Sequence, residues 1–228
     1  MKLRNALRKV RAACFKACLR IPRLPAKEQV LGSFDFSSGL GDAAWLLYGL
    51  ARLMKPEACV EIGSARGKST CYIGLALKRN GRGKLYAIDP HTRTNWNDQG
   101  PVDTLAIIRK NLRKARVADY VEIVRKTSGE AVAGWSARID MLFIDGDHTY
   151  EGVKADWERF SPFMNPFGVV VFHDTLWNIR PDPNWQREDM GVPRFVDELR
   201  IAGYPVVTID KDFGVTLVQP VVGGAKLR

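Results

Sequence analysis

Hydrophobic and polar residues alternate between residues 40 and 218 in a pattern that predicts strands and helices in turn. Short apolar runs rich in β-branched residues predict strands at about 59–62, 84–88, 120–124, 139–144 and 168–172. Apolar positions at helical spacing predict helices at about 43–54, 68–79, 104–116, 129–135, 150–160 and 193–202. Strands that alternate with helices through short connections are typical of an α/β, doubly wound parallel sheet with helices on both faces.

The C-terminal part of the chain departs from this alternation. The runs YPVVTID and FGVTLVQP are separated only by Lys211 and Asp212, which predicts an antiparallel hairpin at the edge of the sheet. Capping residues support the predicted helix ends: Asp42, Asp103 and Thr149 as N-caps, and Gly81 as a C-cap.

Polar residues gather directly after the apolar run at 139–144. The stretch IDMLFIDGDHTYEG places Asp145, Asp147 and His148 within four residues at the end of a strand predicted to be buried on both faces. Ligands bind open α/β sheets at the carboxyl ends of their strands, because the loops there lie outside the hydrogen-bond ladder. These three residues are therefore candidates for a reactive site.

The chain is expected to consist of a basic amphipathic N-terminal extension, residues 1–40, and one domain, residues 41–228. The chain carries a formal charge of +10, and residues 1–27 hold nine bases and no acid, which leaves only +1 for residues 28–228. The nearly neutral body argues against a nucleic-acid partner. Within residues 1–27, apolar residues at intervals of three and four predict a basic amphipathic helix. Such a helix would pack on its own protein, join a homo-oligomer, or lie on an anionic membrane surface.

Length and cysteine usage predict the compartment. A chain of 228 residues with 46% hydrophobic content can bury a substantial core, and it contains no apolar run long enough to cross a membrane and no signal-peptide pattern. The protein is thus predicted to be cytoplasmic, with peripheral membrane contact through residues 1–27 as an alternative. Cys14, Cys18, Cys59 and Cys71 show no paired spacing, which favours buried free thiols over disulfides or zinc.

A glycine-rich turn follows the first predicted strand in CVEIGSARGKST. Gly63 and Gly67 stand where the strand turns into a helix, which favours close approach of a ligand to free backbone amides. The spacing matches neither the G-x-G-x-x-G dinucleotide fingerprint nor a phosphate-binding Walker loop. Asp89 ends the next strand, where a carboxylate can bind ribose hydroxyls; the alternative is a capped turn and a solvated aspartate.

Taken in order, these motifs resemble those of the class I S-adenosylmethionine-dependent methyltransferases. The segments IDGDHTYEGVKADW and PFGVVVFHDT are similar to the small-molecule and sugar O-methyltransferases of the macrocin type, and more distantly to catechol O-methyltransferase. The resemblance covers about residues 42–218 and implies a Rossmann-like fold. It implies that S-adenosylmethionine is bound by Glu61, Gly63, Ser64, Gly67, Ser69, Asp89, Ser128 and Asp145: Glu61, Gly63 and Ser69 at the methionine end, Asp89 at the ribose, Ser128 at the adenine and Asp145 beside the methyl group.

The resemblance also implies a divalent cation, Mg²⁺ or Mn²⁺, held by Asp145, His173 and Asp174, with His148 as the catalytic base. A cation and a base make chemical sense because an aliphatic hydroxyl is a poor nucleophile. Macrocin-type proteins carry a glutamate at the position of His173, and an imidazole favours Mn²⁺, Fe²⁺, Co²⁺ or Zn²⁺ over Mg²⁺. The alternatives are that His173 stands outside the coordination sphere, with water or Thr175 in its place, and that His148 only bonds a backbone carbonyl. Asp147 is expected to orient a ligand or His148, and His91 to be an ordinary loop residue.

The acceptor is expected to be a small molecule or a sugar. Loops 91–102 and 176–192 are expected to overhang the site, where Trp96, Trp177 and Trp185 could stack on a ring and Arg180 and Arg187 could meet an anionic group. The alternative is that these residues only pack a lid. A metal-dependent hydrolase could use the same Asp and His set, and an NAD-dependent oxidoreductase could use the same fold. The hydrolase leaves the glycine turn unexplained, and the oxidoreductase lacks its third glycine.

Overall fold

The computed structural model describes residues 34, 36, 38–92, 103–179 and 187–220. The chain divides into two compact units, residues 1–35 and 36–228, and the following concerns the second. The predicted basic helix within residues 1–27 and the cysteines Cys14 and Cys18 lie outside the described residues, as do Trp96, Arg180 and Trp185.

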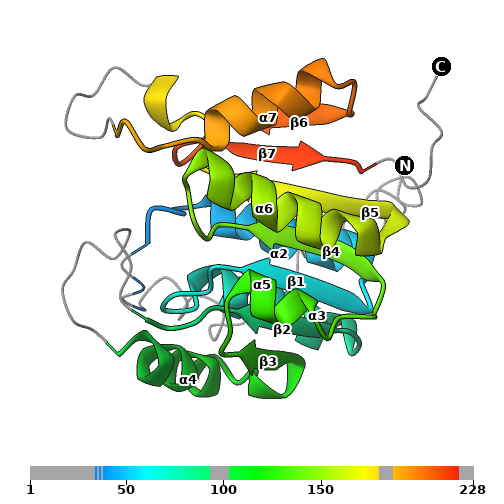
Figure 1. Cartoon of the computed structure of the whole chain (residues 1–228). Coiled ribbons are helices and arrows are strands. Elements are labelled where there is room, and N and C mark those ends of the chain that lie inside the picture. Colours follow the sequence, from blue (N-terminus) through cyan, green and yellow to red (C-terminus); the bar gives the residue numbers. More distant parts are fainter. Residues whose placement is uncertain (1–33, 35, 37, 93–102, 180–186, 221–228) are drawn as a thin grey trace, which may run out of the picture. The chain divides into compact units, whose positions relative to one another are not determined.

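Seven strands form one mixed sheet in the order β3-β2-β1-β4-β5-β7-β6 (Figure 1). The strands are β1 (Ala58–Ile62), β2 (Lys84–Ile88), β3 (Val121–Val124), β4 (Ile139–Ile144), β5 (Met164–His173), β6 (Val206–Ile209) and β7 (Val215–Val218). The first five are parallel, and β7 pairs antiparallel with both β5 and β6. The predicted doubly wound sheet with an antiparallel hairpin at its edge is confirmed.

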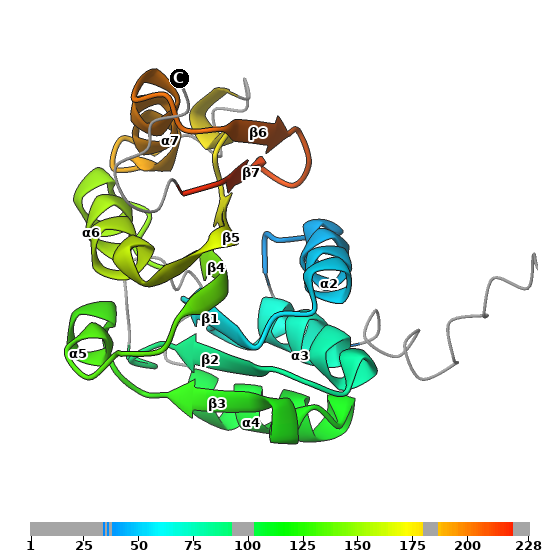
Figure 2. The same ribbon diagram turned by 90° about the vertical axis from the view of Figure 1, so that its right-hand side faces the viewer.

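Helices cover both faces of the sheet (Figure 2). On one face lie α2 (Ala43–Met54), α3 (Lys68–Asn80) and α4 (Thr104–Ala115), and on the other lie α5 (Ser128–Val132), α6 (Tyr150–Phe160) and α7 (Val192–Ile201). Short 3-10 turns add η2 (Ala118–Tyr120), η3 (Ser161–Phe163) and η4 (Trp177–Ile179). Among the described residues, no helix is both long and apolar enough to cross a bilayer.

Burial explains why the central strands form. All six residues of β4 except Asp140 are buried, and all five of β1 are buried, as expected for strands covered by helices on both faces. The core between the sheet and α5–α7 contains Phe160, Phe172 and Leu142, each fully buried. Cys59 and Cys71 are buried free thiols, as predicted.

The largest error in the predicted elements concerns β5, which begins at Met164 instead of residue 168. Ile139 pairs with Met164 and Met141 with Val169, so an irregularity in the ladder inserts extra residues around Pro166 and Gly168. Proline and glycine are normally signals that a strand has ended, but here they lie in a bulge. The prediction therefore missed the first four residues of the strand.

The caps were partly predicted. Asp103 accepts from the Ala106 amide at 2.9 Å and Thr149 from the Gly152 amide at 3.1 Å, and Gly81 ends α3 with φ +69°, as expected. Asp42 occupies the N-cap position of α2 without capping it. Instead the Ala43 amide donates to Asp212 Oδ2 at 2.7 Å, which brings the β6–β7 turn against the start of α2.

Candidate functional site

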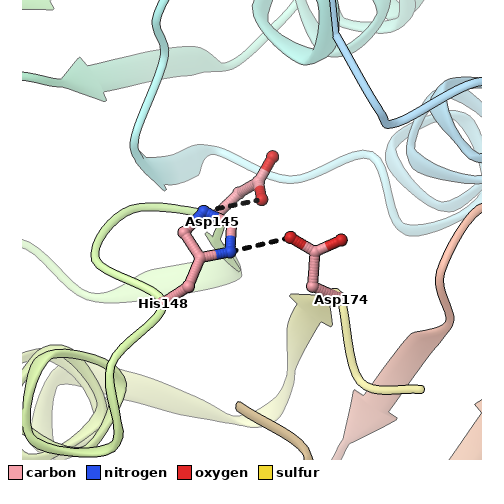
Figure 3. A group of neighbouring side chains, drawn as sticks. All are labelled: Asp145, His148 and Asp174. Carbon is pink, nitrogen blue, oxygen red and sulfur yellow. Dashed lines mark ion pairs between the residues drawn. The ribbon is translucent and has the colours of Figure 1, made fainter. Parts of the chain in front are cut away.

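Three polar side chains converge at the carboxyl ends of two neighbouring strands (Figure 3). Because β4 and β5 are parallel with Ile144 opposite Phe172, the residues that follow them, Asp145 and Asp174, come to the same point of the sheet edge. His148 Nδ1 lies 2.7 Å from Asp174 Oδ2, and its Nε2 lies 3.9 Å from Asp145 Oδ1. Asp174 has φ +59°, a left-handed conformation that is uncommon for non-glycine residues and frequent at functional sites.

His148 is held by its own loop. Thr149 caps α6 immediately after it, and Asp147 Oδ1 accepts from the Thr149 amide at 3.0 Å. Asp147 thus fixes the entry to the helix and positions His148 only through the backbone. Burial acts to lower the pKa of His148, but its hydrogen bond to Asp174 and the charges of Asp174 and Asp145 outweigh this, and the pKa is raised above the ordinary value of 6.5.

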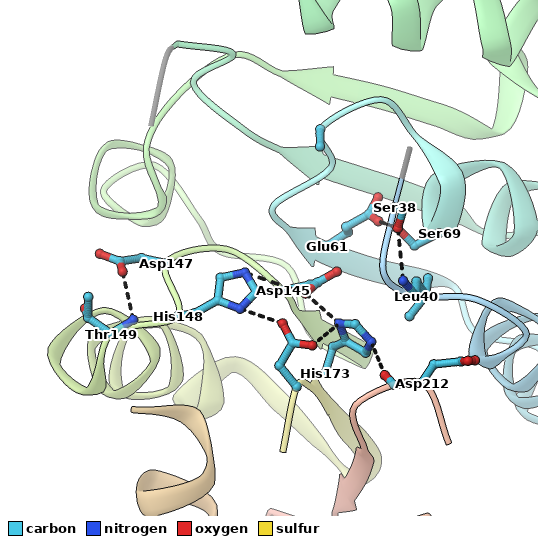
Figure 4. Close-up of polar contacts among 12 residues, drawn as sticks. Ser38, Leu40, Glu61, Ser69, Asp145, Asp147, His148, Thr149, His173 and Asp212 are labelled. Atoms are coloured by element: carbon cyan, nitrogen blue, oxygen red, sulfur yellow. Dashed lines mark hydrogen bonds and ion pairs between the residues drawn. The ribbon is translucent and has the colours of Figure 1, made fainter. Parts of the chain in front are cut away.

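His173, the last residue of β5, lies on the other side of Asp145 (Figure 4). Its Nε2 donates to the Asp212 carbonyl at 2.8 Å, and its Nδ1 is 3.1 Å from both Asp145 Oδ1 and Asp174 Oδ1. Burial acts to lower its pKa, yet the two carboxylates raise it to about 9. A protonated Nδ1 between two carboxylates is therefore the favoured form at neutral pH.

These residues could hold a divalent cation. Ligand atoms of Asp145, His148 and Asp174 all lie within 4.8 Å of one another. The predicted set of Asp145, His173 and Asp174 shares two members with this group, while His173 has one ring nitrogen occupied by a backbone carbonyl. Two carboxylates and one imidazole suit Mn²⁺, Fe²⁺, Co²⁺ or Zn²⁺ better than Mg²⁺.

The glycine turn after β1 is required by close packing. Gly63 has φ +89°, and a Cβ there would lie 2.0 Å from the Asp145 carbonyl oxygen; Gly67 has φ +83°, and a Cβ there would lie 2.6 Å from Ile108 Cγ1. Both glycines therefore let protein segments approach one another, and Gly63 specifically joins the end of β1 to the end of β4. A different signal points to a ligand at this turn: Ser64 lines the cavity and is 2% exposed, and its hydroxyl has no hydrogen-bond partner within the described part of the chain.

A hydrogen bond between Glu61 and Ser69 joins β1 to the start of α3, on either side of the glycine turn (Figure 4). Glu61 is fully buried and accepts hydrogen bonds from the hydroxyls of Ser69 and Thr70 in the first turn of α3. Burial is the main cause that raises the pKa of Glu61 to about 8. Ser69 lines the cavity, whereas Glu61 is not among the lining residues, so Glu61 reaches the cavity only through its partner.

Asp89 and Ser128 lie where the sequence places them, at the ends of β2 and β3. Asp89 accepts from the amides of Ala65 at 2.8 Å and His91 at 2.6 Å, which holds its carboxylate at the cavity wall. His91 lies in a loop, as expected, but it has φ +52° and a fully buried ring, with Nδ1 2.9 Å from Thr104 Oγ1. Ser128 begins α5 and accepts from Arg159 Nη1 at 2.8 Å.

A cavity of about 1220 Å³ connects these groups. Its lining includes every predicted site residue except Glu61 and Gly67, together with several that the sequence did not reveal. These additional residues include Phe36, Ser38, Gly39, Leu40, Lys68, Asp156 and Phe213. Four of them, Phe36, Ser38, Gly39 and Leu40, fall within the predicted extension of residues 1–40 and line the cavity together with residues of 41–228. The sequence offered a signal for Asp156 alone, as an acid within an otherwise apolar helical stripe.

Aromatic and charged side chains line the part of the cavity beyond Asp174. Trp177 stacks on Phe213 with ring centroids 4.4 Å apart and an interplanar angle of 28°. Arg187, predicted to meet an anionic group, makes a two-pronged ion pair with Asp189, with both N–O distances 3.0 Å. Trp177 thus lines the cavity, and its stacking partner comes from the C-terminal hairpin.

Comparisons with known proteins are consistent with this arrangement. The family model described as "Methyltransferase domain" matches residues 60–175. The mouse catechol O-methyltransferase domain-containing protein 1 is 26% identical over 173 residues, which cover 72% of this chain and 60% of that protein. The chain spans only 15% to 60% of the length of three curated relatives that it matches.

Solved structures share the fold. The O-methyltransferase TomG of Streptomyces achromogenes, in complex with SAM, superposes with a TM-score of 0.63 at 21% identity over 92% of this chain and 95% of that chain. The SAH-bound methyltransferase PaMTH1 of Podospora anserina gives a TM-score of 0.63 at 17% identity, over 94% of this chain and 95% of that one.

Proposed function

We propose, from the premise that the chain belongs to the methyltransferase-domain family whose model matches residues 60–175, that it methylates a hydroxyl oxygen of a small molecule or sugar with the help of a divalent cation. The domain is an S-adenosylmethionine-dependent methyltransferase. The observation that carries the finer proposal is the convergence of His148 with Asp145 and Asp174 beside the cavity. A family of methyltransferases supports neither the hydrolase nor the oxidoreductase alternative.

The residues of the glycine turn fit S-adenosylmethionine. The unpartnered Ser64 hydroxyl and the first amides of α3 suit the carboxylate of the methionine end, since Gly67 provides no side-chain cap for that helix. Asp89 is already oriented by two backbone amides and keeps acceptor capacity for ribose hydroxyls. The structure of the O-methyltransferase TomG, which has a similar fold, was determined in complex with SAM. This supports the same cofactor here.

His148 is the proposed base. Its Nδ1–H donates to Asp174, which leaves Nε2 as the nitrogen that can accept a proton on the side of Asp145. An acceptor hydroxyl that loses its proton to Nε2 attacks the methyl carbon as the carbon–sulfur bond breaks. The products are the methyl ether and S-adenosylhomocysteine, and Asp174 stabilises the imidazolium that His148 becomes.

The donor set of Asp145, His148 and Asp174 fits a divalent cation by charge and by ligand type. When bound, such a cation would lower the pKa of a hydroxyl at this edge and orient it. If His148 is a ligand, the base must be another group, so the two roles of His148 are alternatives that experiment can separate.

We propose that the acceptor contains an aromatic ring or a sugar ring. The reason is that Trp177 and Phe213, whose rings stack on each other, line the cavity and could pack against such a ring. The mouse relative carries catechol O-methyltransferase in its name, which supports an aromatic diol as the first compound to test.

Transfer of labelled methyl groups from S-adenosylmethionine tests the function. The acceptors would be catechols, monophenols and nucleotide sugars, each assayed with and without EDTA and with added Mn²⁺ or Mg²⁺. We expect transfer to at least one class, its loss in EDTA and recovery with Mn²⁺. Asp174→Asn should abolish transfer, and Asp119→Asn, the same change at an exposed residue of η2, should not. Transfer that is indifferent to chelators would refute the cation.

The predictions for residues 1–27 remain proposals. A basic amphipathic helix there would either lie on an anionic membrane or contact a second subunit. Sedimentation of the full chain with phosphatidylserine vesicles at low salt, and its loss at high salt, would support the membrane. A change in solution mass upon removal of residues 1–27, without vesicle binding, would support the subunit contact.

A further inference from the structure

Asp156 is a buried carboxylate that the proposed reaction does not use. It lies on α6, is 3% exposed and lines the same cavity as the proposed cofactor residues. Arg159 Nη1 lies 3.5 Å from Asp156 Oδ1 and also donates to Ser128 at 2.8 Å, and the Ser128 hydroxyl makes a hydrogen bond to Asp156. Burial is the main cause that raises the pKa of Asp156 to about 6. The chain itself therefore stabilises this charge only in part, although the carboxylate is the main form at pH 7.5.

The lack of a side chain at Gly146, in the loop before α6, leaves Asp156 open to the cavity. Gly146 follows Asp145 directly, and a Cβ at Gly146 would lie 3.4 Å from Asp156 Oδ2 and 3.2 Å from Ile62 Cγ2. Any larger residue would thus project into the space between the ends of β1 and β4 and the carboxylate. The absence of a side chain at Gly146 leaves Oδ2 on the cavity side of the helix.

The position of Asp156 along the sheet edge limits the part of the cofactor that it can meet. Ser128, which shares Arg159 with Asp156, follows β3, and Gly146 follows β4. Asp89, proposed for the ribose, follows β2, and the α3 N-terminus, proposed for the methionine end, follows β1. Asp156 is therefore associated with a third part of the cavity, the part lined by residues of α6 and by Ser128 of α5. Figure 2 shows that these two helices cover the same face of the sheet.

A carboxylate accepts hydrogen bonds and donates none, so its partner must be a donor. S-adenosylmethionine has three kinds of donor: the α-ammonium group, the ribose hydroxyls and the 6-amino group of adenine. The first two belong to the parts of the cavity at α3 and Asp89, which leaves the 6-amino group. On the basis of the proposed function, we infer that Asp156 accepts a hydrogen bond from the adenine 6-amino group and thereby selects adenine over purines that lack this group.

Two ligands and three variants test the inference by isothermal titration calorimetry. The ligands are S-adenosylhomocysteine and its analogue with an unsubstituted purine in place of adenine, which differ only in the 6-amino group. The wild type should prefer the adenine ligand by roughly 10- to 100-fold, the range of a hydrogen bond to a charged group. Asp156→Ala should bring the two affinities to within about threefold, because no acceptor remains.

Asp156→Asn keeps the side-chain volume and one acceptor oxygen without the charge, so it should give an intermediate preference. Glu158→Ala is the matched control on the exposed side of the same helix and should keep the wild-type preference. An unchanged preference in Asp156→Ala would overturn the inference. If Asp156→Ala does not fold, as judged by circular dichroism, an unchanged preference in Asp156→Asn would overturn it equally. Failure of the wild type to bind S-adenosylhomocysteine would instead refute the proposed function on which the inference rests.

Discussion

The two halves of the cavity are built in different ways. The half at β1 and β2 is a local strand–turn–helix unit, in which backbone amides and the buried Glu61, Ser69 and Thr70 fix the shape. The half at β4 and β5 consists of side chains from distant segments, with the Asp212 carbonyl in the C-terminal hairpin holding His173 at the end of β5. Backbone geometry suits a cofactor that never changes, whereas side chains from separate loops can be exchanged to fit different acceptors.

The largest effect is expected in the β4–β5 half. Replacement of His148 by alanine removes the proposed base and should lower kcat by roughly 10²- to 10⁴-fold, while S-adenosylhomocysteine affinity stays within about twofold. In the wild type, kcat should rise with pH through a midpoint above 6.5, because Asp174 raises the pKa of His148. That rise should be absent in the variant. Methyl transfer to the best acceptor across pH 5–9 measures both, and normal turnover in His148→Ala would exclude His148 as the base.

The next effect concerns the junction of the two halves at Gly63. Gly63→Ala places a Cβ 2.0 Å from the Asp145 carbonyl oxygen at φ +89°, so the ends of β1 and β4 must separate. We expect a loss of about 2–4 kcal/mol in the free energy of unfolding and weaker S-adenosylhomocysteine binding. Gly81→Ala is the control: it has φ +69° but no atom within 4 Å of an added Cβ, and it should lose about 1 kcal/mol. Equal losses in urea unfolding would show that steric contact at Gly63 is unimportant.

Glu61 provides a pH test of the β1–β2 half. Its pKa in the folded state is raised to about 8 from an ordinary 4.5, so the folded protein retains a proton that the unfolded chain loses. The stabilising contribution is complete below about pH 4.5 and is lost as the pH rises through 8, with a slope of up to about 1.4 kcal/mol per pH unit. Glu61→Gln should remove this slope from the urea stability curve between pH 5 and 9. The same slope in both proteins would show that Glu61 is not the titrating group.

The smallest effect is expected at the turn between β6 and β7. Asp212→Asn removes the negative charge that accepts from the Ala43 amide, and we expect a loss of about 0.5 kcal/mol at the start of α2. Asp42→Asn removes a charge from the same helix end but breaks no capping hydrogen bond, so its loss should be smaller. Thermal unfolding at low salt compares the two variants. A larger loss of stability in Asp42→Asn would show that Asp42 caps α2, as the sequence predicts.

The sequence by itself determined the fold class, because burial on both faces leaves a direct record in continuous apolar runs such as 139–144, and caps such as Thr149 mark helix ends locally. It also located Asp145, His148 and Asp174 as residues at strand ends, since parallel strands bring their carboxyl ends to one edge.

Only the tertiary structure decided which side chains meet. Asp212 caps a helix 169 residues away, Phe213 stacks on Trp177, and Asp156 reaches the cavity because Gly146 leaves room for it. The pairing of His148 with Asp174, and of His173 with a backbone carbonyl, likewise depends on strand register and on the hairpin. Such contacts join segments that are far apart in the chain, so their geometry follows from packing of the whole domain and leaves no periodic signal in the sequence.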